Sequence, residues 1–419
     1  MYLHPAAMTT KRSIAFVCHP YHRGGVTRWM ADAAIAAAAA GCTVYFVAPE
    51  PASPFFSAGG RETMLSLLQP HSGQLRIISR RVGYTFEFGT EAYRAAIYAA
   101  LITRHIPAGV PLVISDDDAI WQGACSAADR YPVTGVLHGD QDYYYNKARK
   151  HHRQLSACVC VSRRIARNLL AGCPDIDKTK VATIPCGINL PAYNPAPPVA
   201  GLLRLAFIGR LTDYEKRAED LTAICAALRD RGCSFHLHIA GNSDSSATAF
   251  AALFKAQGVG ENVTFHGWQA RPQVQQLLDA TDVALLTSNS EGMPLVMMEA
   301  LASGCAFTGT RVSGIEDFEH DTRAADCLTV YAVGDVADAA AKILAIAAVP
   351  AAQRQQSARR LAETEFSMQV CLERYFTAID RPQSAPIAAV PVALTATGML
   401  RSRLIALARY LKVALMSRK

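Results

Sequence analysis

The chain has 419 residues, of which 51% are hydrophobic and 18% are charged. This length exceeds what one ordinary hydrophobic core fills, so we expect two globular domains and a tail. No apolar run approaches the roughly 20 residues that span a bilayer, and the twelve cysteines form no CxxC pair. These features argue against a transmembrane protein, a disulfide scaffold and a structural zinc site. The first residues lack the apolar segment of a signal peptide, so we expect a cytoplasmic location.

The positive charge of the protein is concentrated at one end of the chain. From residue 381 onward there are seven basic residues and no acidic residue, which accounts for the whole formal net charge of +7. The basic residues are Arg381, Arg401, Arg403, Arg409, Lys412, Arg418 and Lys419. An uncharged body argues against nucleic acid as a partner and indicates a separate role for the tail.

The first half of the chain alternates apolar strands with helical segments. A strand is expected at 13–18, followed by a glycine turn, a helix over about 26–40 and a strand at 43–48. Further strands are expected at 75–78, 111–115, 133–137, 157–162 and 181–185, with helices at 91–104 and 163–171. This alternation predicts a parallel sheet with helices on both faces.

The pattern restarts after a proline-rich hinge at 191–201. Strands are expected at 203–209, 234–241, 263–267 and 282–288, with a helix at 218–232. We therefore predict an α/β protein in which two Rossmann-like domains face each other across a cleft. The predicted parts are a first domain over 1–195, a second over 196–365, a helix at 366–380 that returns to the first domain, and a flexible linker with a basic amphipathic helix over 381–419.

The stretch SEGMPLVMMEALASG, residues 290–304, places a carboxylate inside a helix that is apolar on every side. Such a helix is buried, and a buried carboxylate normally has a partner, so Glu299 needs one. Glu291 is expected in the loop before this helix, with Pro294 at the first helical position. The backbone N–H groups of Gly292, Met293 and Leu295 would lie at the positive end of the helix, which favours an anion such as phosphate.

The strand-end loop GRLTDYEKR, residues 209–217, supplies the matching positive charge. Arg210 offers a bidentate fork and Lys216 a point charge, and both are placed to reach a diphosphate. A molecule with hydroxyl groups at both ends and a diphosphate between them satisfies all of these groups. A nucleotide sugar is such a molecule.

Together these motifs resemble the signature of the family-four retaining glycosyltransferases of the GT-B fold. The resemblance rests on the two glutamates separated by seven residues with GMP after the first, the loop containing Arg210 and Lys216, and the AG turn that ends at Gly241. It also rests on FHG at 265–267, IPCGIN at 184–189 and the N-terminal GGVTRWMADAAIAAAAAGCTVYFVA. The similarity covers about residues 13 to 380 in the correct order.

The resemblance implies a role for each matching residue of the second domain. Glu291 would contact donor sugar hydroxyls near the reacting carbon, and Glu299 would bind the ribose hydroxyls. Arg210 and Lys216 would neutralise the leaving diphosphate, with Gly241 and the turn at 292–295 lining the donor site. The family uses no metal and retains the anomeric configuration, so neither a metal nor another cofactor is expected.

In the first domain, the resemblance implies that His138 orients the donor sugar and its hydroxymethyl group. Gly24 and Gly25 match the glycine loop that approaches the diphosphate and the acceptor. Acceptor selectivity is expected in the loops around 51–90 and 139–153. This domain would bind a glycan or a lipid-linked acceptor.

The sequence departs from the family pattern at three positions. Arg217 stands where the family often has glycine, and Cys186 and Asn189 replace the commoner asparagine and aspartate of the IPNGID-like turn. We expect the substitutions at 186 and 189 to be tolerated, whereas Arg217 puts the local geometry in question.

Several of these residues also have purely structural interpretations. Glu299 could pair with an internal arginine, His138 could pack in the core, and Arg210 with Lys216 could belong to a solvated loop. The triplet Asp116–Asp118 resembles an acidic metal-binding motif, but we favour a polar cap in which Asp118 starts a helix.

The tail sequence LRSRLIALARYLKVAL places Leu400, Leu404, Leu407 and Leu411 on one helical stripe beside basic residues. A basic amphipathic helix of this kind is typical of binding to an anionic membrane surface, and residues 398–419 would provide it. Packing on another subunit is the alternative.

The function we expect is that of a retaining glycosyltransferase of cell-surface polysaccharide or glycolipid synthesis, located at the inner face of the membrane. A catalytically silent nucleotide-sugar-binding scaffold and a GT-B-type sugar-nucleotide epimerase are the alternatives.

Overall fold

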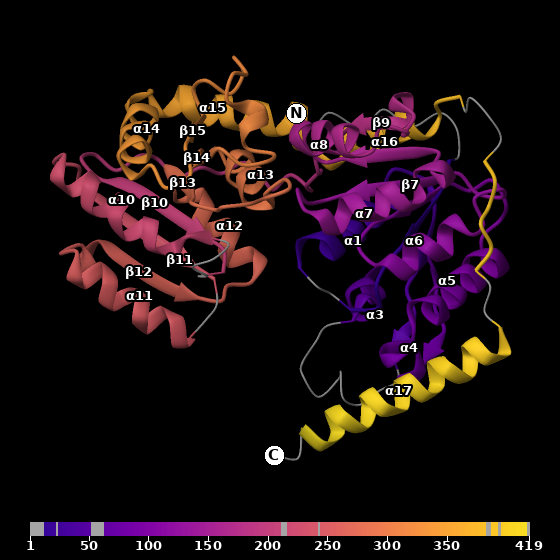
Figure 1. Cartoon of the computed structure of the whole chain (residues 1–419). Helices are drawn as coiled ribbons and strands as arrows, with labels where there is room; N and C mark the ends of the chain where they lie inside the picture. Colours follow the sequence, from indigo (N-terminus) through magenta and orange to yellow (C-terminus); the bar gives the residue numbers. More distant parts are fainter. Residues whose placement is uncertain are drawn as a thin grey trace. The chain divides into compact units, whose positions relative to one another are not determined.

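The computed structural model describes residues 12–21, 24–51, 63–210, 216–241, 244–382, 387–392 and 395–416 (Figure 1). The chain divides into two compact units. The first unit comprises Met1–Cys160, Ala166–Ile184 and Leu372–Lys419, and the second comprises Val161–Ile165 and Pro185–Cys371. Each unit is built on its own parallel sheet.

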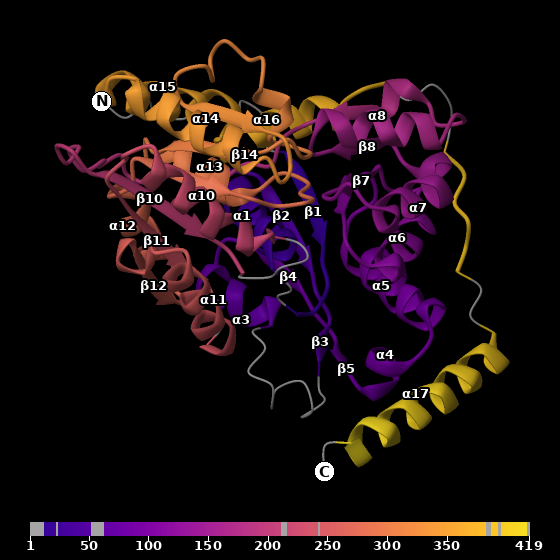
Figure 2. The ribbon, with the colours of Figure 1, turned by 60° about the vertical axis from the view of Figure 1, so that its left-hand side comes forward.

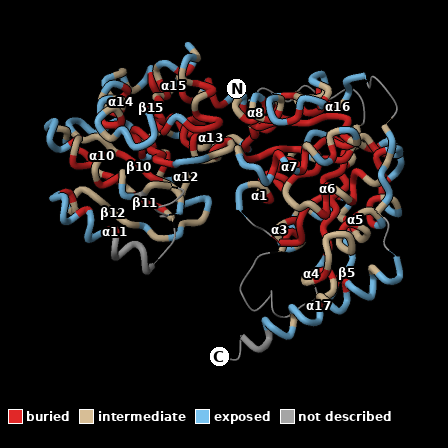
Figure 3. The backbone as a smooth tube through the Cα atoms, viewed as in Figure 1, coloured by how far each residue is buried: buried red, intermediate tan, exposed pale blue. Residues whose placement is uncertain are grey.

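The sheet of the first unit has seven parallel strands in the order β4-β2-β1-β6-β7-β8-β9. The strands are β1 (Ser13–Val17), β2 (Thr43–Val47), β4 (Arg76–Ile78), β6 (Leu112–Ile114), β7 (Val133–Leu137), β8 (Ala157–Cys160) and β9 (Val181–Thr183). Because helices cover both faces of such a sheet, β6, β7 and β8 are buried at every position. Much of the tube of this unit is red in Figure 3. The seven strands predicted for this half of the chain are confirmed.

Helices of the first unit pack on this sheet or on one another. They are α1 (Gly25–Ala39), α3 (Met64–Leu68), α4 (Tyr84–Phe88), α5 (Glu91–His105), α6 (Asp118–Cys125), α7 (Asp142–His151), most of α8 (Arg163–Gly172), most of α16 (Met368–Ile379) and α17 (Ala396–Met416). A two-stranded ladder of β3 (Glu50–Pro51) and β5 (Arg81–Val82) precedes α4. Short 3-10 turns lie at Gln69–His71, His152–Gln154 and Lys178–Lys180.

The second unit contains a six-stranded parallel sheet in the order β12-β11-β10-β13-β14-β15. Its strands are β10 (Leu203–Ile208), β11 (Phe235–Ala240), β12 (Val263–Gly267), β13 (Val283–Leu286), β14 (Ala306–Thr310) and β15 (Leu328–Tyr331). Four of these were predicted, whereas β14 and β15 were not. Strand β14 has the sequence AFTGT, whose small and polar residues lack the β-branched apolar pattern of a typical strand.

Helices also flank the second sheet. They are α10 (Ala218–Asp230), α11 (Asp244–Ala256), α12 (Arg271–Asp279), α13 (Leu295–Ala302), α14 (Val336–Ala348) and α15 (Ala351–Leu361), with a π-helical turn at Ala362–Phe366. Short 3-10 turns lie at Gly260–Asn262 and Glu316–Phe318. Both units are therefore Rossmann-like α/β layers, as predicted.

No single helix among the described residues is long and apolar enough to cross a membrane. Helix α14 and the segment Ala351–Phe366 together have the length and composition of a membrane span, but the two are bent by 105° at their junction.

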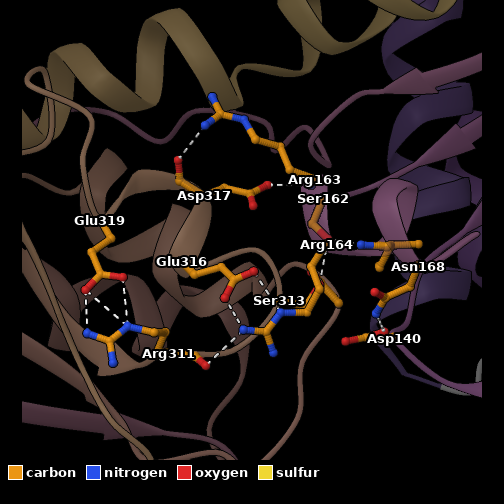
Figure 4. Close-up of polar contacts among 12 residues, drawn as sticks. Asp140, Ser162, Arg163, Arg164, Asn168, Arg311, Ser313, Glu316, Asp317 and Glu319 are labelled. Atoms are coloured by element: carbon orange, nitrogen blue, oxygen red, sulfur yellow. Dashed lines mark hydrogen bonds and ion pairs between the residues drawn. The ribbon is translucent and has the colours of Figure 1, made fainter. Parts of the chain in front are cut away.

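A polar network joins the start of α8 to the loop after β14, within the second unit (Figure 4). The side chain of Arg164 pairs with Glu316, and the backbone N–H of Arg163 donates to Asp317 Oδ2 at 2.8 Å. The hydroxyls of Ser162 and Ser313 are 2.6 Å apart in the buried interior. These contacts explain why Val161–Ile165 belongs to the second unit although the rest of α8 belongs to the first.

A buried ion cluster fastens α15 to the second sheet. Asp282, at the start of β13, accepts hydrogen bonds from Arg204 Nε at 3.0 Å and Arg204 Nη2 at 2.9 Å. Arg354 of α15 approaches the same carboxylate at 3.4 Å, and both Asp282 and Arg354 are about 95% buried. Removing one member of such a cluster leaves a buried charge without compensation.

We expect Asp282→Asn to lower the free energy of unfolding by about 3–5 kcal/mol, because two arginines lose their shared counter-ion. Urea unfolding followed by circular dichroism measures the change. The matched control is Asp230→Asn, an exposed carboxylate paired with its neighbour Arg229, which should change stability by less than about 0.5 kcal/mol. Equal effects of the two substitutions would contradict the buried-cluster interpretation.

Candidate functional site

Two glycine turns follow adjacent strands at the carboxyl edge of the second sheet, where open α/β sheets bind ligands. Gly209 comes directly after β10 and donates its N–H to Ala240 O at 2.9 Å. Gly241 comes directly after β11 and donates its N–H to Gly267 O at 2.9 Å. A Cβ atom at Gly241 would lie 1.7 Å from Gly209 O, so the close approach of the two turns requires glycine at this position.

A pocket of about 350 Å³ opens beside these turns. It is lined by Ile208, Gly209, Arg210, Ala240, Gly241, Trp268, Gln269 and Val274. Arg210 is thus placed at the strand edge, as predicted, on the pocket wall. Trp268 is 73% exposed although tryptophan is normally well buried. An exposed indole at a pocket rim provides a flat stacking surface, and no sequence pattern predicted it.

A second pocket, of about 260 Å³, contains Glu299. Its other lining residues are Ile188, Asn189, Pro191, Arg271, Pro272, Val274, Gln275 and Leu278. Val274 lines both pockets, so the Glu299 pocket adjoins the pocket of Arg210 and Trp268. Glu299 is half-buried and lines this pocket. Its neighbours in α13, Met298 and Ala300, are buried. Arg271, an exposed residue at the start of α12, lines the same pocket.

An ion pair joins the two loops that were predicted to carry opposite charges. Lys216 Nζ contacts Glu291 Oε1, and both side chains are more than four-fifths buried. The Ser288 hydroxyl donates to the same Oε1 atom at 2.7 Å. The Thr287 hydroxyl donates to the backbone carbonyl of Lys216, which ties the two loops together a second time. The structure therefore places Lys216 and Glu291 in direct contact at the carboxyl ends of β10 and β13.

Arg217, the departure from the family pattern, adopts the left-handed conformation that glycine adopts easily. Its φ is 43° and its ψ is 50°, and no other non-glycine residue in the described ranges has a positive φ. Its guanidinium donates to Asp220 Oδ2 at 2.7 Å and to Oδ1 at 3.0 Å. The guanidinium is thus held by both carboxylate oxygens of Asp220 while the backbone keeps the left-handed conformation.

The turn before α13 is supported from the neighbouring loop. The Ser313 hydroxyl donates to Gly292 O at 3.2 Å, and a Cβ atom at Gly314 would lie 2.6 Å from the same oxygen. Helix α13 begins at Leu295, so the prediction that Pro294 is the first helical residue was wrong: Pro294 is the N-cap, with an extended ψ of 119°. Met293 is buried, whereas Gly292 and Leu295 are half-buried.

In the first unit, His138 directly follows β7 and packs against aromatic rings. Its ring centroid is 5.0 Å from that of Trp29, which lies 5.5 Å from Tyr375 of α16. Burial lowers the pKa of His138 to about 3, so the imidazole is neutral near pH 7. The structural interpretation of His138 as a packed histidine thus also fits its surroundings.

Gly24 and Gly25 lie at the start of α1. Gly24 is the N-cap with φ 109°, and its carbonyl accepts a hydrogen bond from the Thr27 hydroxyl at 3.1 Å. Both glycines are exposed. The preceding residues 22–23 lie outside the described part of the chain, as do residues 52–62 of the predicted acceptor loop and 211–215 of the loop before Lys216.

The acidic triplet after β6 is arranged as a helix cap. Asp117 is the N-cap of α6 and accepts the N–H of Ala119 at 2.8 Å, while Asp118 is the first helical residue. Asp116 accepts a hydrogen bond from the Tyr144 hydroxyl at 3.0 Å. Within the described residues no group of three or more histidine, cysteine, aspartate or glutamate side chains has a metal-binding arrangement.

Two family models match the chain, one in each half. The model described as "Glycosyltransferase Family 4" matches residues 23–191, and the model described as "Glycosyl transferases group 1" matches residues 203–348. The chain belongs to the family-four glycosyltransferases of the GT-B fold.

Curated relatives of this family share part of the sequence. The putative colanic acid biosynthesis glycosyltransferase WcaL of Escherichia coli (strain K12) is 28% identical over 154 residues, which are 35% of this chain and 37% of WcaL. The amylovoran biosynthesis glycosyltransferase AmsK of Erwinia amylovora is 30% identical over 172 residues, which are 38% of this chain and 41% of AmsK. The chain thus spans about two fifths of the length of these curated relatives.

Solved structures share the fold over a larger part of the chain. Anabaena Alr3699/HepE, crystallised in complex with UDP and glucose, aligns with a TM-score of 0.64 and 16% identity. The alignment covers 88% of this chain and 99% of that protein. The lipopolysaccharide outer core galactosyltransferase WaaB aligns with the same TM-score, identity and coverage. At this identity the likeness establishes the fold alone.

The buried His138 gives the protein a specific pH dependence of stability. Between about pH 6.5 and pH 3 the unfolded chain protonates this histidine and the folded chain does not, so the free energy of unfolding falls as the pH is lowered, by up to about 1.4 kcal/mol per pH unit. We expect His138→Gln to reduce this slope between about pH 7 and pH 5 in urea unfolding measurements. His151, whose pKa burial lowers to about 4, retains its own contribution.

The control for this measurement is His105→Gln, because His105 is exposed at the end of α5. An equal fall in the slope for His105→Gln and His138→Gln would contradict the assignment of the slope to the buried histidine. A slope that is the same in His138→Gln and wild type would show that His138 takes up its proton in the folded state.

Proposed function

We propose that this protein is a retaining glycosyltransferase that transfers a sugar from a nucleoside diphosphate donor to a glycan or lipid-linked acceptor. The single observation that carries the proposal is the contact between Lys216 and Glu291, in the same unit as the pockets lined by Arg210 and by Glu299. The names of WcaL and AmsK, which refer to colanic acid and amylovoran biosynthesis, support polysaccharide synthesis as the setting.

The two adjoining pockets suit a nucleoside. We propose that the base stacks on Trp268, since stacking on an aromatic ring contributes about 1–3 kcal/mol per base in nucleic-acid complexes. Glu299 lines the adjoining pocket and would accept hydrogen bonds from the ribose hydroxyls. Its carboxylate has two oxygens, so it can form charge-assisted hydrogen bonds with two adjacent hydroxyls. The UDP bound by HepE supports a diphosphate donor of this type.

The positive groups suit the diphosphate. When the bond between the anomeric carbon and the phosphate oxygen breaks, negative charge grows on the diphosphate, and fixed cations stabilise it most in the transition state. Lys216 is preorganised for this purpose by Glu291 and by the Thr287 hydroxyl on its backbone. Arg210 would supply the second positive charge from the same strand-end loop. We propose that these cations replace a divalent metal.

Retention of configuration would follow from attack on the face from which the diphosphate departs. The acceptor hydroxyl oxygen bonds to the anomeric carbon, the leaving phosphate oxygen takes the electron pair of the broken bond, and the acceptor proton passes to a donor phosphate oxygen. Glu291 would hold donor hydroxyls near that carbon. The contributions that the family resemblance implies for His138, Gly24, Gly25, Gly241, Gly292, Met293 and Leu295 remain part of this proposal.

We expect the purified protein to be stabilised against heat by UDP, GDP or ADP and by a sugar derivative of the same nucleotide, and to turn that donor over in the presence of a chelator. Lys216→Met should lower kcat by about 100-fold or more, because one fixed charge on the leaving group is lost. Glu291→Gln should lower kcat by a similar factor of about 100. Product analysis by chromatography measures both.

The matched control is Glu319→Gln, which breaks the ion pair with Arg311 elsewhere in the second unit and should leave kcat unchanged. Saturable nucleotide binding without turnover across an acceptor panel would identify the silent scaffold instead. Interconversion of two nucleotide sugars without an acceptor would identify an epimerase. Full activity in both site variants would contradict the proposed site.

A further inference from the structure

The last helix, α17, packs on the first unit with one narrow face. Ser402 and Ala406 are fully buried, and the Ser402 hydroxyl accepts the N–H of Thr90 at 3.0 Å. One turn further on, the Tyr410 ring lies 5.7 Å from Tyr84 and 6.2 Å from Phe88. Figures 1 and 2 both show α17 running past α4 along this face. The spacing of four residues between contacts defines one side of the helix.

Arginine strengthens the same contact. Arg409 donates to the backbone carbonyl of Phe88 at 3.1 Å, at the end of α4. A Cβ atom at Gly89 would lie 2.6 Å from the Ser402 hydroxyl oxygen, so the helix approaches the backbone closely there. The orientation of α17 about its own axis is therefore fixed by its contact with α4 and the start of α5.

This orientation turns the leucine stripe into solvent. Leu400 is 59% exposed, Leu404 60%, Leu407 44% and Leu411 50%. At about 100° per residue these four side chains fall within a sector of roughly 60° on the helix circumference, away from Ser402 and Ala406. The pale blue tube of α17 in Figure 3 shows the same exposure along the helix. A contiguous apolar stripe in solvent marks an interaction surface.

Basic residues border the stripe on both sides. At about 100° per residue, Arg403 lies roughly 40° beyond one edge, and Arg401 and Lys412 lie roughly 60° and 80° beyond the other. All three are exposed. From Arg381 onward the chain has seven basic residues and no acidic one. The family models end at residue 348, so this helix lies outside the residues that they match.

We propose that the exposed leucine face of α17 lies in the surface of an anionic lipid bilayer, with the helix axis parallel to the membrane plane. The leucines enter the boundary between headgroups and acyl chains, and the flanking arginines and Lys412 contact lipid phosphates. A second copy of this chain fits less well, because pairing two such helices would bring positive charges together without an acidic residue to neutralise them. This inference does not depend on the proposed transferase activity.

The test is co-sedimentation of the full chain with phosphatidylcholine vesicles that contain or lack about 30% phosphatidylglycerol. Binding to the anionic vesicles should be at least about tenfold tighter than to the neutral ones, and about 0.5 M salt should weaken it. The double variant Leu400→Gln/Leu404→Gln should lower the partition coefficient by about tenfold or more, because its apolar contact is lost. Arg401→Gln/Lys412→Gln should lower it for anionic vesicles only.

The matched control is Leu253→Gln, a leucine of α11 in the second unit that is also exposed and should bind vesicles like the wild type. Circular dichroism and thermal unfolding confirm that each variant is folded. Absence of vesicle binding, equal binding to neutral and anionic vesicles, or no effect of the leucine substitutions would overturn the proposal. The proposal would also be overturned if analytical ultracentrifugation showed a dimer that the leucine substitutions dissociate, and the protein did not bind vesicles.

Discussion

The candidate site depends on one ion pair between residues 75 positions apart in the sequence, Lys216 and Glu291. Each comes from a loop at the carboxyl end of a central strand, and hydroxyls of Thr287 and Ser288 hold both partners. A largely buried pair contributes little net stability, because desolvation of two charges offsets their attraction. In the proposed mechanism, the pair holds a lysine at a defined place, where it would stabilise the charge of a leaving diphosphate.

The sheet topology brings the rest of the site to the same edge. Strands β10, β11 and β13 are parallel neighbours, so they end at the same edge of the sheet. The turns that follow them, at Gly209, Gly241 and Ser288, therefore lie close together. A second layer of contacts supports this edge: Arg164 holds Glu316, and Ser313 of the same loop holds Gly292 O. The site is therefore a consequence of strand order, fixed by polar contacts behind it.

The sequence predicted the parts of the molecule that follow local rules. Short apolar strands alternating with helices predicted most of both sheets. The charges at 216 and 291 were each assigned to a ligand, and their direct contact was not predicted. Strand β14 was missed because its small and polar residues carry no strand pattern, and burial by tertiary packing decides its conformation. Trp268 was missed because exposure is not visible in a sequence, and the contact of Ser162 with Ser313 was missed because 151 residues separate them. The leucine stripe of α17 was predicted, but only the packing of Ser402 and Ala406 shows which face remains in solvent.

The most direct measurement is a crystal structure of the full chain with the nucleoside diphosphate that stabilises it most. We expect the diphosphate to lie within hydrogen-bond distance of Lys216 Nζ and the Arg210 guanidinium, with the base against Trp268 and the ribose at Glu299. A nucleotide bound away from the carboxyl edge of the second sheet, or a Lys216 that contacts only Glu291 in the complex, would contradict it.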